Sequence, residues 1–336
     1  MNRMLPRPRF WAETGLQMKT RFSLMGELLA FLLLYLISSM AQGFLTTIPV
    51  TAWMMKTQGE SIMAAVTAGQ SPQTLILRLM EQMPDWIMLV MLLTSAVTGL
   101  AAVIYVRKFQ KRSLASMGLR GKALPEALLG FLVGLGLLCA ALALGSAMGG
   151  FRLLTEPRPD GSRVLWVLAA LFCCLVRGAA LELLLRGYFA PSLGGRYPVG
   201  LALGASTVLS AALETGGSLL SLTGLNCLLL ALLLGIWVIK RGSLWGACAM
   251  HGAWLFAVSF LFGFAPTGGA HEGIRLLDVD VDVYRSGITG GEYGPEASLC
   301  VTLVLLAALA AALALRPRDP APGQAAPTNE RPANFL

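Results

Sequence analysis

Long, uninterrupted stretches of apolar residues alternate with short polar segments along most of the chain. Eight such stretches lie at about 24–45, 86–106, 125–148, 164–190, 198–213, 218–239, 243–264 and 295–315. Stretches of about 18 or more apolar residues with few charges are typical of membrane spans. Their apolar residues are continuous rather than alternating, which favours helices over the strands of a barrel. The pattern therefore predicts an all-α, polytopic transmembrane bundle of about eight helices.

Polar segments flank this membrane domain, which we expect to occupy residues 24–315. Residues 1–23 are polar and basic, and residues 316–336 are rich in Pro, Ala and Asn. The C-terminal segment has too little apolar surface to build a core, so we expect a disordered tail. Between the first two spans lies a semi-polar segment, 46–83. Part of it, roughly Ser61–Met83, is typical of an amphipathic helix on the membrane surface.

The distribution of charge predicts how the bundle sits in the membrane. The net charge is +8, but only 13% of the residues are charged and the mean hydropathy is +0.68. The basic residues gather in the N-terminal segment and at 107–122, 186–196, 240–241 and 316–318. The positive-inside rule assigns these segments to the cytoplasm and the acidic 265–294 loop to the outside. We therefore expect a multi-pass protein of the plasma membrane that contacts lipid, has both termini in the cytoplasm and binds no nucleic acid.

A few ionisable residues lie within the predicted spans, where charge is energetically costly and therefore indicates a functional site. They are Arg177, Glu182, Arg186, Glu214 and His251. Glu182 precedes Arg186 by four residues, so the two lie on one helix face in the favourable order for an ion pair. Glu182 and His251 each lie about eight residues, roughly 12 Å, from the cytoplasmic ends of their helices. They are thus expected at a similar depth, while Arg177 requires a partner, either Glu214 or Glu182.

Glu182, Glu214 and His251 form a set that suits hydrolytic chemistry. Two carboxylates and an imidazole can hold a divalent metal such as zinc and leave a position open for water. Without a metal, either glutamate can serve as a general base. The structural alternatives are an ion pair that stabilises a buried acid and a histidine that forms a hydrogen bond between helices.

Three short motifs resemble those of the CPBP intramembrane proteases, which are also called Rce1-like, CAAX-protease or Abi proteins. The first family motif has two adjacent glutamates, three further residues and Arg-Gly, and it aligns with Leu181–Gly187. The second, Phe-x-x-x-His, aligns with Ser210 to Glu214. The third, His-x-x-x-Asn, aligns with His251 to Leu255.

The resemblance extends over about 160–265 and implies both a fold and an activity. It implies an Rce1-like helical bundle and an endopeptidase that acts on a membrane-associated protein or peptide. The residues that it implies as catalytic are Glu182, Arg186, Glu214 and His251. Possible metal ligands are Glu182, Glu214 and His251.

The chain also departs from the family motifs at three positions, which are Leu181, Glu214 and Leu255. In the family, the first glutamate is held to activate the attacking water, and here it is Leu181. Loss of an oxyanion donor, such as the asparagine replaced by Leu255, lowers a rate by about 100- to 1000-fold. Two other functions therefore stay open. One is an inactive relative that works as a membrane scaffold or bacteriocin-immunity protein, and the other is a small transporter, although no inverted repeat is visible.

The alternatives predict different geometries for the buried charges. A protease requires Glu182, Glu214 and His251 to converge on one cavity. An inactive relative predicts that the Arg177–Glu214 or Arg186–Glu182 ion pair fills the site and leaves no space for water.

Overall fold

The computed structural model describes residues 5–18, 22–69, 71, 83–154, 161–264 and 276–318. The α-helices of the first half are α1 (Arg9–Gln17), α2 (Leu24–Trp53), α3 (Gly59–Thr67), α5 (Asp85–Thr94), α6 (Ala96–Ile104) and α7 (Ala123–Ala147). Those of the second half are α8 (Gly161–Glu182), α9 (Ala190–Gly194), α10 (Val199–Glu214), α11 (Leu222–Arg241), α12 (Trp245–Phe256), α13 (Ser286–Thr289) and α14 (Leu299–Ala314).

Several short elements connect or extend these helices. The π-helical segments are η1 (Met54–Gln58), η2 (Tyr105–Phe109), η4 (Leu183–Phe189) and η5 (Ala257–Leu261). The 3-10 turns are η3 (Leu114–Met117), η6 (Gly291–Tyr293) and η7 (Pro295–Ala297). Two strands, β1 (Phe151–Leu154) and β2 (Asp278–Val281), form an antiparallel pair in which Phe151 is opposite Val281.

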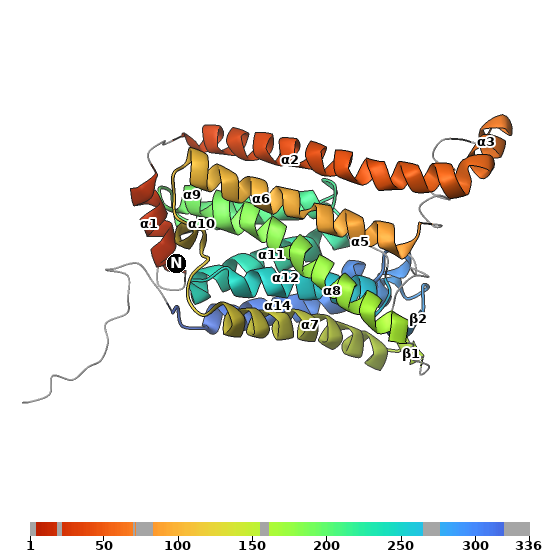
Figure 1. Cartoon of the computed structure of the whole chain (residues 1–336). Helices are drawn as coiled ribbons and strands as arrows, with labels where there is room; N and C mark the ends of the chain where they lie inside the picture. Colours follow the sequence, from red (N-terminus) through yellow and green to blue (C-terminus); the bar gives the residue numbers. More distant parts are fainter. Residues whose placement is uncertain are drawn as a thin grey trace, which may run out of the picture.

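The apolar helices confirm the predicted architecture. Five are long and apolar enough to cross a membrane, at 24–65, 85–109, 123–147, 164–194 and 222–241. Three shorter apolar helices lie at 199–214, 245–261 and 299–314. The described chain is thus an all-α, polytopic membrane bundle with the expected eight apolar segments, and its helices run side by side along one direction (Figure 1).

Several helix boundaries differ from the prediction, and those of the first and last apolar helices matter most. The first apolar helix continues past position 45 to 65, through Pro49, because a proline in a membrane helix can be accommodated by neighbouring helices and local adjustments. The last one begins at Leu299 rather than 295. A surface helix was expected over 61–83, and α3 covers the part of it up to Thr67. Residues 70 and 72–82 of this segment lie outside the described residues. Residues 319–336 of the predicted tail also lie outside them.

The centre of the bundle is α12, which packs chiefly against α7 and α8. Glycines make these contacts close. A Cβ atom on Gly178 of α8 would lie 2.4 Å from the backbone nitrogen of Gly252 on α12, and one on Gly134 of α7 would lie 2.3 Å from the carbonyl oxygen of Met250. The backbones therefore approach to within contact distance, which is how small residues strengthen helix packing in membranes.

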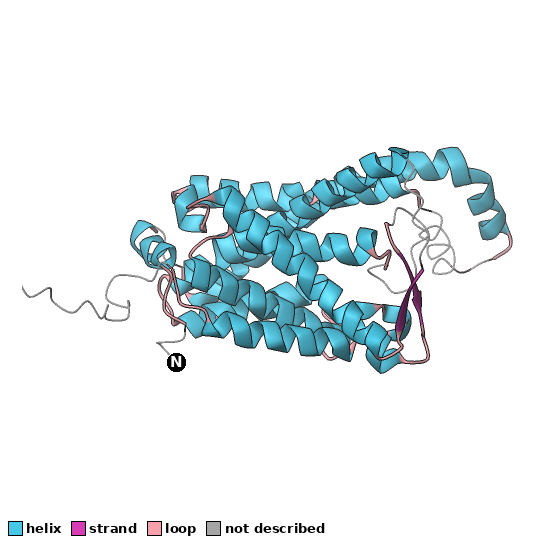
Figure 2. Ribbon diagram, turned by 90° about the horizontal axis from the view of Figure 1, so that it is seen from below, coloured by secondary structure: helices cyan, strands magenta, loops and turns pink. Residues whose placement is uncertain are grey.

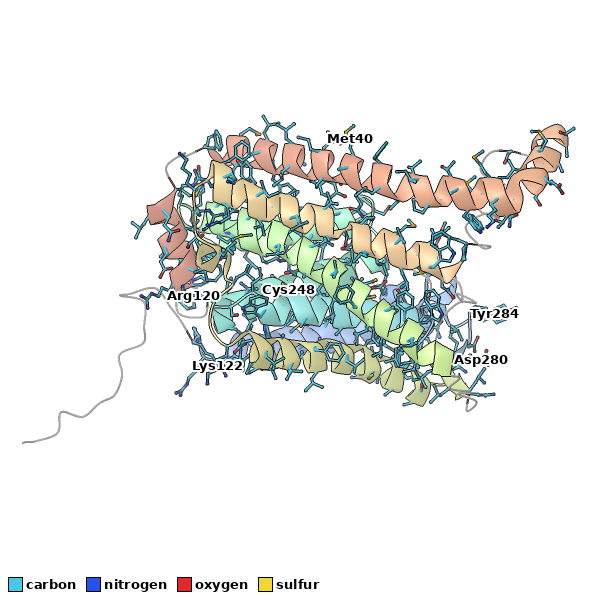
Figure 3. All side chains as sticks on the ribbon, in the orientation of Figure 1. Met40, Arg120, Lys122, Cys248, Asp280 and Tyr284 are labelled. Carbon is cyan, nitrogen blue, oxygen red and sulfur yellow. The ribbon has the colours of Figure 1, made fainter. Side chains whose placement is uncertain are left out.

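The periphery of the bundle is apolar and exposed. Helix α2 packs against α5 and α6 along one side, and its other side exposes Leu32, Leu36, Met40 and Phe44. Met40 points away from the bundle in Figure 3. An exposed apolar face of this length suits contact with lipid chains.

The two ends of the bundle carry different charges. Arg120 and Lys122 lie at the end that also holds α1, whereas Asp280 and Tyr284 lie at the end with the strands (Figures 2 and 3). This separation agrees with the sidedness inferred from the sequence. The orientation in the membrane itself remains a prediction.

The N-terminal segment, expected only to be polar and basic, contains a helix that packs on the bundle. Phe10 and Trp11 of α1 are buried, and Trp11 lies against Gly194 of α9, where a Cβ atom would be 2.0 Å from the indole. Arg112 is buried beneath α1 and donates hydrogen bonds to Thr14 (3.0 Å) and to the Gln110 side chain (2.8 Å). The helix is therefore an integral part of this end of the bundle.

Candidate functional site

The buried acid and base of the first motif lie where α8 changes its hydrogen-bond pattern. Glu182 ends the α-helical part of the span, and Arg186 lies in the π-helical segment η4. Such π-helical turns occur often at functional sites. Arg186 Nη1 is 3.0 Å from Glu182 Oε1, and both side chains are almost fully buried. The ion pair expected from the four-residue spacing is therefore present.

Arg186 also joins three helices. Its Nη1 donates a hydrogen bond to Ser210 Oγ on α10 at 3.0 Å, and its Nη2 donates to the carbonyl oxygen of Ala231 on α11 at 2.7 Å. A guanidinium has five donors in a fixed planar arrangement, so these bonds fix its position. The Glu182 carboxylate is consequently held by a rigid cation.

His251 lies between two carboxylates. Its Nδ1 is 3.1 Å from Glu182 Oε1, and its Nε2 is 3.9 Å from Glu214 Oε1. The close contact of Gly178 with Gly252 brings α8 and α12 near enough for the first of these distances. Glu182 and His251 therefore lie at the same level of the bundle, as their spacing predicted. Cys248, one turn before His251 on α12, is buried inside the bundle (Figure 3).

Glu214 ends α10 and is the partner of Arg177. The distance from Arg177 Nη2 to Glu214 Oε1 is 3.8 Å, and their side chains are 29% and 23% exposed. Of the two partners considered for Arg177, the structure therefore selects Glu214. Glu214 Oε1 is buried and accepts no hydrogen bond from any described residue. Polar atoms separated by more than 3.5 Å are often connected by water, so this oxygen is a suitable acceptor for a water molecule.

A cavity borders Glu214 and His251. It offers about 100 Å³ to water, and the residues that line it include Ser210, Glu214, Cys227, His251, Trp254 and Glu296. One water needs about 10–15 Å³ by this measure, so several fit. Glu182 and Arg186 do not line the cavity but lie beyond His251. Solvent can therefore reach His251 and Glu214 from one side while the ion pair supports the imidazole from the other.

The three expected metal ligands do not surround a common point. His251 directs one ring nitrogen to Glu182 and the other to Glu214, so it separates the two carboxylates. A shared ion would need one imidazole nitrogen and both carboxylates at about 2 Å. Among the described residues, no group of three His, Cys, Asp or Glu side chains is arranged to hold a metal. The residues present therefore do not fit the zinc site that the sequence suggested.

Comparison with known protein families adds to this geometry. Residues 163–257 match the family described as type II CAAX prenyl endopeptidase Rce1-like. This segment of the chain is therefore similar to the Rce1-like family. The matched segment contains Glu182, Arg186, Glu214 and His251. Comparisons with curated proteins and with solved structures gave no match.

Two departures from the family motifs are visible in the site. Leu181 is buried in the apolar core, and Leu255 lines the cavity. Neither position provides a polar group. A base and an oxyanion donor for this cavity must come from other residues.

One residue that lines the cavity was not among the candidate site residues predicted from the sequence. Glu296, in the turn η7 before α14, lines the same cavity as Glu214, and its Oε1 accepts a hydrogen bond of 2.8 Å from Trp254 Nε1. It lies outside the matched segment and in none of the three motifs. The signal in the sequence was the segment Gly290–Glu296, which resembles bacterial members of the family but carries none of their three motifs.

Proposed function

We propose that this protein is an intramembrane endopeptidase that hydrolyses a peptide bond of a membrane-associated protein or peptide. The observation that carries the proposal is the cavity within the bundle, which has space for water beside both Glu214 and His251. Hydrolysis requires an activated water, a donor for the tetrahedral oxyanion and a proton donor for the leaving amine.

His251 is suited to stabilise the oxyanion. When both ring nitrogens carry protons, Nδ1–H donates to Glu182 at 3.1 Å and Nε2–H is available on the side of Glu214. Arg186 offsets the negative charge of Glu182, so this carboxylate can remain buried beside the imidazole. The Glu182–Arg186 pair acts as a positioning element, because it fixes the ring of His251.

Glu214 is suited to activate the water. Its Oε1 has no hydrogen-bond donor among the described residues and borders space that water can occupy. The carboxylate accepts a proton from water while the water oxygen bonds to the carbonyl carbon of the substrate. Nε2–H of His251 then donates to the resulting oxyanion. The role that the family assigns to its first glutamate passes in this chain from position 181 to Glu214.

An inactive membrane scaffold is the second candidate, and the Arg177–Glu214 contact favours it. Arg177 shares the carboxylate that the mechanism needs. The inactive form was expected to fill the site with ion pairs and to leave no cavity. The distance of 3.8 Å between Arg177 and Glu214 is longer than a direct hydrogen bond, and the cavity persists. The geometry therefore favours the hydrolase.

Proteolysis is tested by the new peptide ends that the protein generates in a membrane. Membrane proteins from cells that express the wild type are compared, by mass spectrometry of their termini, with those from cells expressing Glu214→Gln or His251→Ala. The exposed Glu60→Gln on α3 serves as the matched control. We expect termini that are present in the wild type and in Glu60→Gln and absent in both site variants. Identical termini in all four samples would contradict the proposal.

A further inference from the structure

The cavity contains two carboxylates with different ion-pair and hydrogen-bond partners. Glu214 has the Arg177 guanidinium at 3.8 Å and the His251 imidazole at 3.9 Å. Among the described residues, the Glu296 carboxyl group accepts a hydrogen bond only from the neutral indole N–H of Trp254. No described basic side chain forms an ion pair with Glu296. Glu214 thus has an arginine ion-pair partner, whereas Glu296 has no ion-pair partner among the described residues.

The backbone around Glu296 is held firmly in place. The Asn226 side chain on α11 donates hydrogen bonds to the carbonyl oxygens of Glu296 (2.8 Å) and Ser298 (3.0 Å). Thr302 Oγ1 donates to Asn226 Oδ1 at 2.7 Å and so fixes the amide. The donor to the side chain, Trp254, is three residues after His251 on the same helix. Glu296 is therefore positioned from α11, α12 and α14 together.

Burial has a definite consequence for the charge of Glu296. It raises the pKa of the carboxyl above its ordinary value, and the nearby Glu214 acts in the same direction. The hydrogen bond from Trp254 and the charge of His251 oppose this to a smaller extent. Cys227 is the other titratable neighbour. The environment of Glu296 therefore favours its protonated form.

We propose that Glu296 is a catalytic residue that protonates the leaving amine. This inference rests on the proposed endopeptidase function and names the group that completes it. As the carbon–nitrogen bond breaks, the carboxyl proton of Glu296 passes to the amine nitrogen, and the amine leaves neutral. The water proton taken by Glu214 then returns through the cavity water to Glu296. No proton or electron is gained or lost over the cycle.

The proposal explains how the site can act without the first motif glutamate. Enzymes that use two carboxylates as base and acid place them in environments that separate their proton affinities. Position 181 is leucine, but Glu296 brings a second carboxyl group to the cavity from a segment more than a hundred residues later in the sequence. The pair of Glu214 and Glu296 thereby supplies both roles.

Infrared spectroscopy tests the protonation of Glu296 without any substrate. Protein with ¹³C-labelled glutamate, reconstituted in nanodiscs at neutral pH, is expected to show the carbonyl band of a protonated glutamic acid. Glu296→Gln should remove this band, whereas Glu214→Gln and the control Glu60→Gln should keep it. Glutamine retains an acceptor for Trp254, and an unchanged melting temperature would show that the fold is intact. A spectrum without the band, or a band that survives in Glu296→Gln, would overturn the proposal.

Kinetics separate the failure of this inference from failure of the proposed function. With a cleaved peptide in hand, Glu296→Gln should lower kcat by about 100-fold or more and abolish the loss of rate at high pH. Glu296→Asp should restore part of the rate. If Glu214→Gln abolishes cleavage while Glu296→Gln leaves kcat and its pH profile unchanged, Glu296 is not the proton donor but the protein is still a protease. If the wild type cleaves nothing, both proposals fail.

Discussion

His251 Nδ1 lies 3.1 Å from Glu182 Oε1, one turn from the close contact of Gly178 on α8 with Gly252 on α12. This contact connects the ion pair of the first motif to the cavity. Glu182 is buried and paired with Arg186 at 3.0 Å, and His251 extends from it towards Glu214. Removing any member of this chain of contacts should therefore affect both the stability of the bundle and the chemistry of the cavity.

Replacing Arg186 with methionine should strongly destabilise the protein. Arg186→Met leaves the Glu182 carboxylate buried without its cation, and breaking a buried pair in this way costs about 3–5 kcal/mol. The double variant Glu182→Gln, Arg186→Met removes the uncompensated charge as well and should recover part of the loss. The free energy of unfolding, measured by titration with SDS in mixed micelles, checks this. A change below about 1 kcal/mol in the single variant would contradict the inferred role of the pair.

The contact between α8 and α12 should depend on the absence of a side chain at position 178. Gly178→Ala places a Cβ atom 2.4 Å from the backbone nitrogen of Gly252, and overpacking of this kind costs about 1–3 kcal/mol. Gly204→Ala on α10 is the matched control, because a Cβ atom there meets nothing within 4 Å. In the same SDS titration, the first variant should be destabilised and the second should be neutral or slightly stabilised. Equal stabilities would show that the helices do not pack so closely.

The stability of the protein should depend on pH through Glu296. Its pKa is raised above 4.5, so between about pH 4.5 and the raised value the folded state keeps a proton that the unfolded state has lost. The free energy of unfolding contributed by this group is therefore greatest below that window and falls as pH increases across it. Glu296→Gln removes this dependence. Parallel curves of stability against pH for the wild type and Glu296→Gln would contradict the assignment.

Cysteine labelling tests the predicted sidedness. Tyr284 and Lys122 are both exposed and lie at opposite ends of the bundle (Figure 3). In intact cells, a membrane-impermeant maleimide should label Tyr284→Cys, and it should label Lys122→Cys only after permeabilisation. The wild type is the control, since its six cysteines are buried or only partly exposed. Labelling in the reverse order would place the termini outside.

Much of the fold could be predicted because membrane helices are specified locally. Each apolar stretch is recognised by its own composition, so the number and order of the helices followed from the sequence. The helix α1 could not be recognised in this way, because Phe10 and Trp11 become buried only when α1 packs on α9 and η3. The continuation of α2 past Pro49 was missed for a similar reason, since the hydropathy of the sequence falls there although the helix does not end.

The sequence predicted which residues lie at the same depth in the bundle, but not how their side chains are oriented. Spacing along single helices indicated that Glu182 pairs with Arg186 and that His251 lies level with them. It did not indicate which ring nitrogen of His251 faces which carboxylate. That orientation determines whether Glu182, Glu214 and His251 can share one metal ion. Glu296 was missed because only the closure of the bundle brings the turn before α14 to the cavity.

Isotope incorporation during cleavage tests the central claim most directly. Purified protein in nanodiscs is incubated with membrane-anchored peptides, including a prenylated CAAX peptide, in H₂¹⁸O with a metal chelator present. We predict a cleaved product with ¹⁸O in its new carboxyl group, formed by the wild type and by Glu60→Gln but not by Glu214→Gln. If no peptide acquires ¹⁸O with the wild type, or Glu214→Gln cleaves as fast as the wild type, the proposed hydrolysis at this site is wrong.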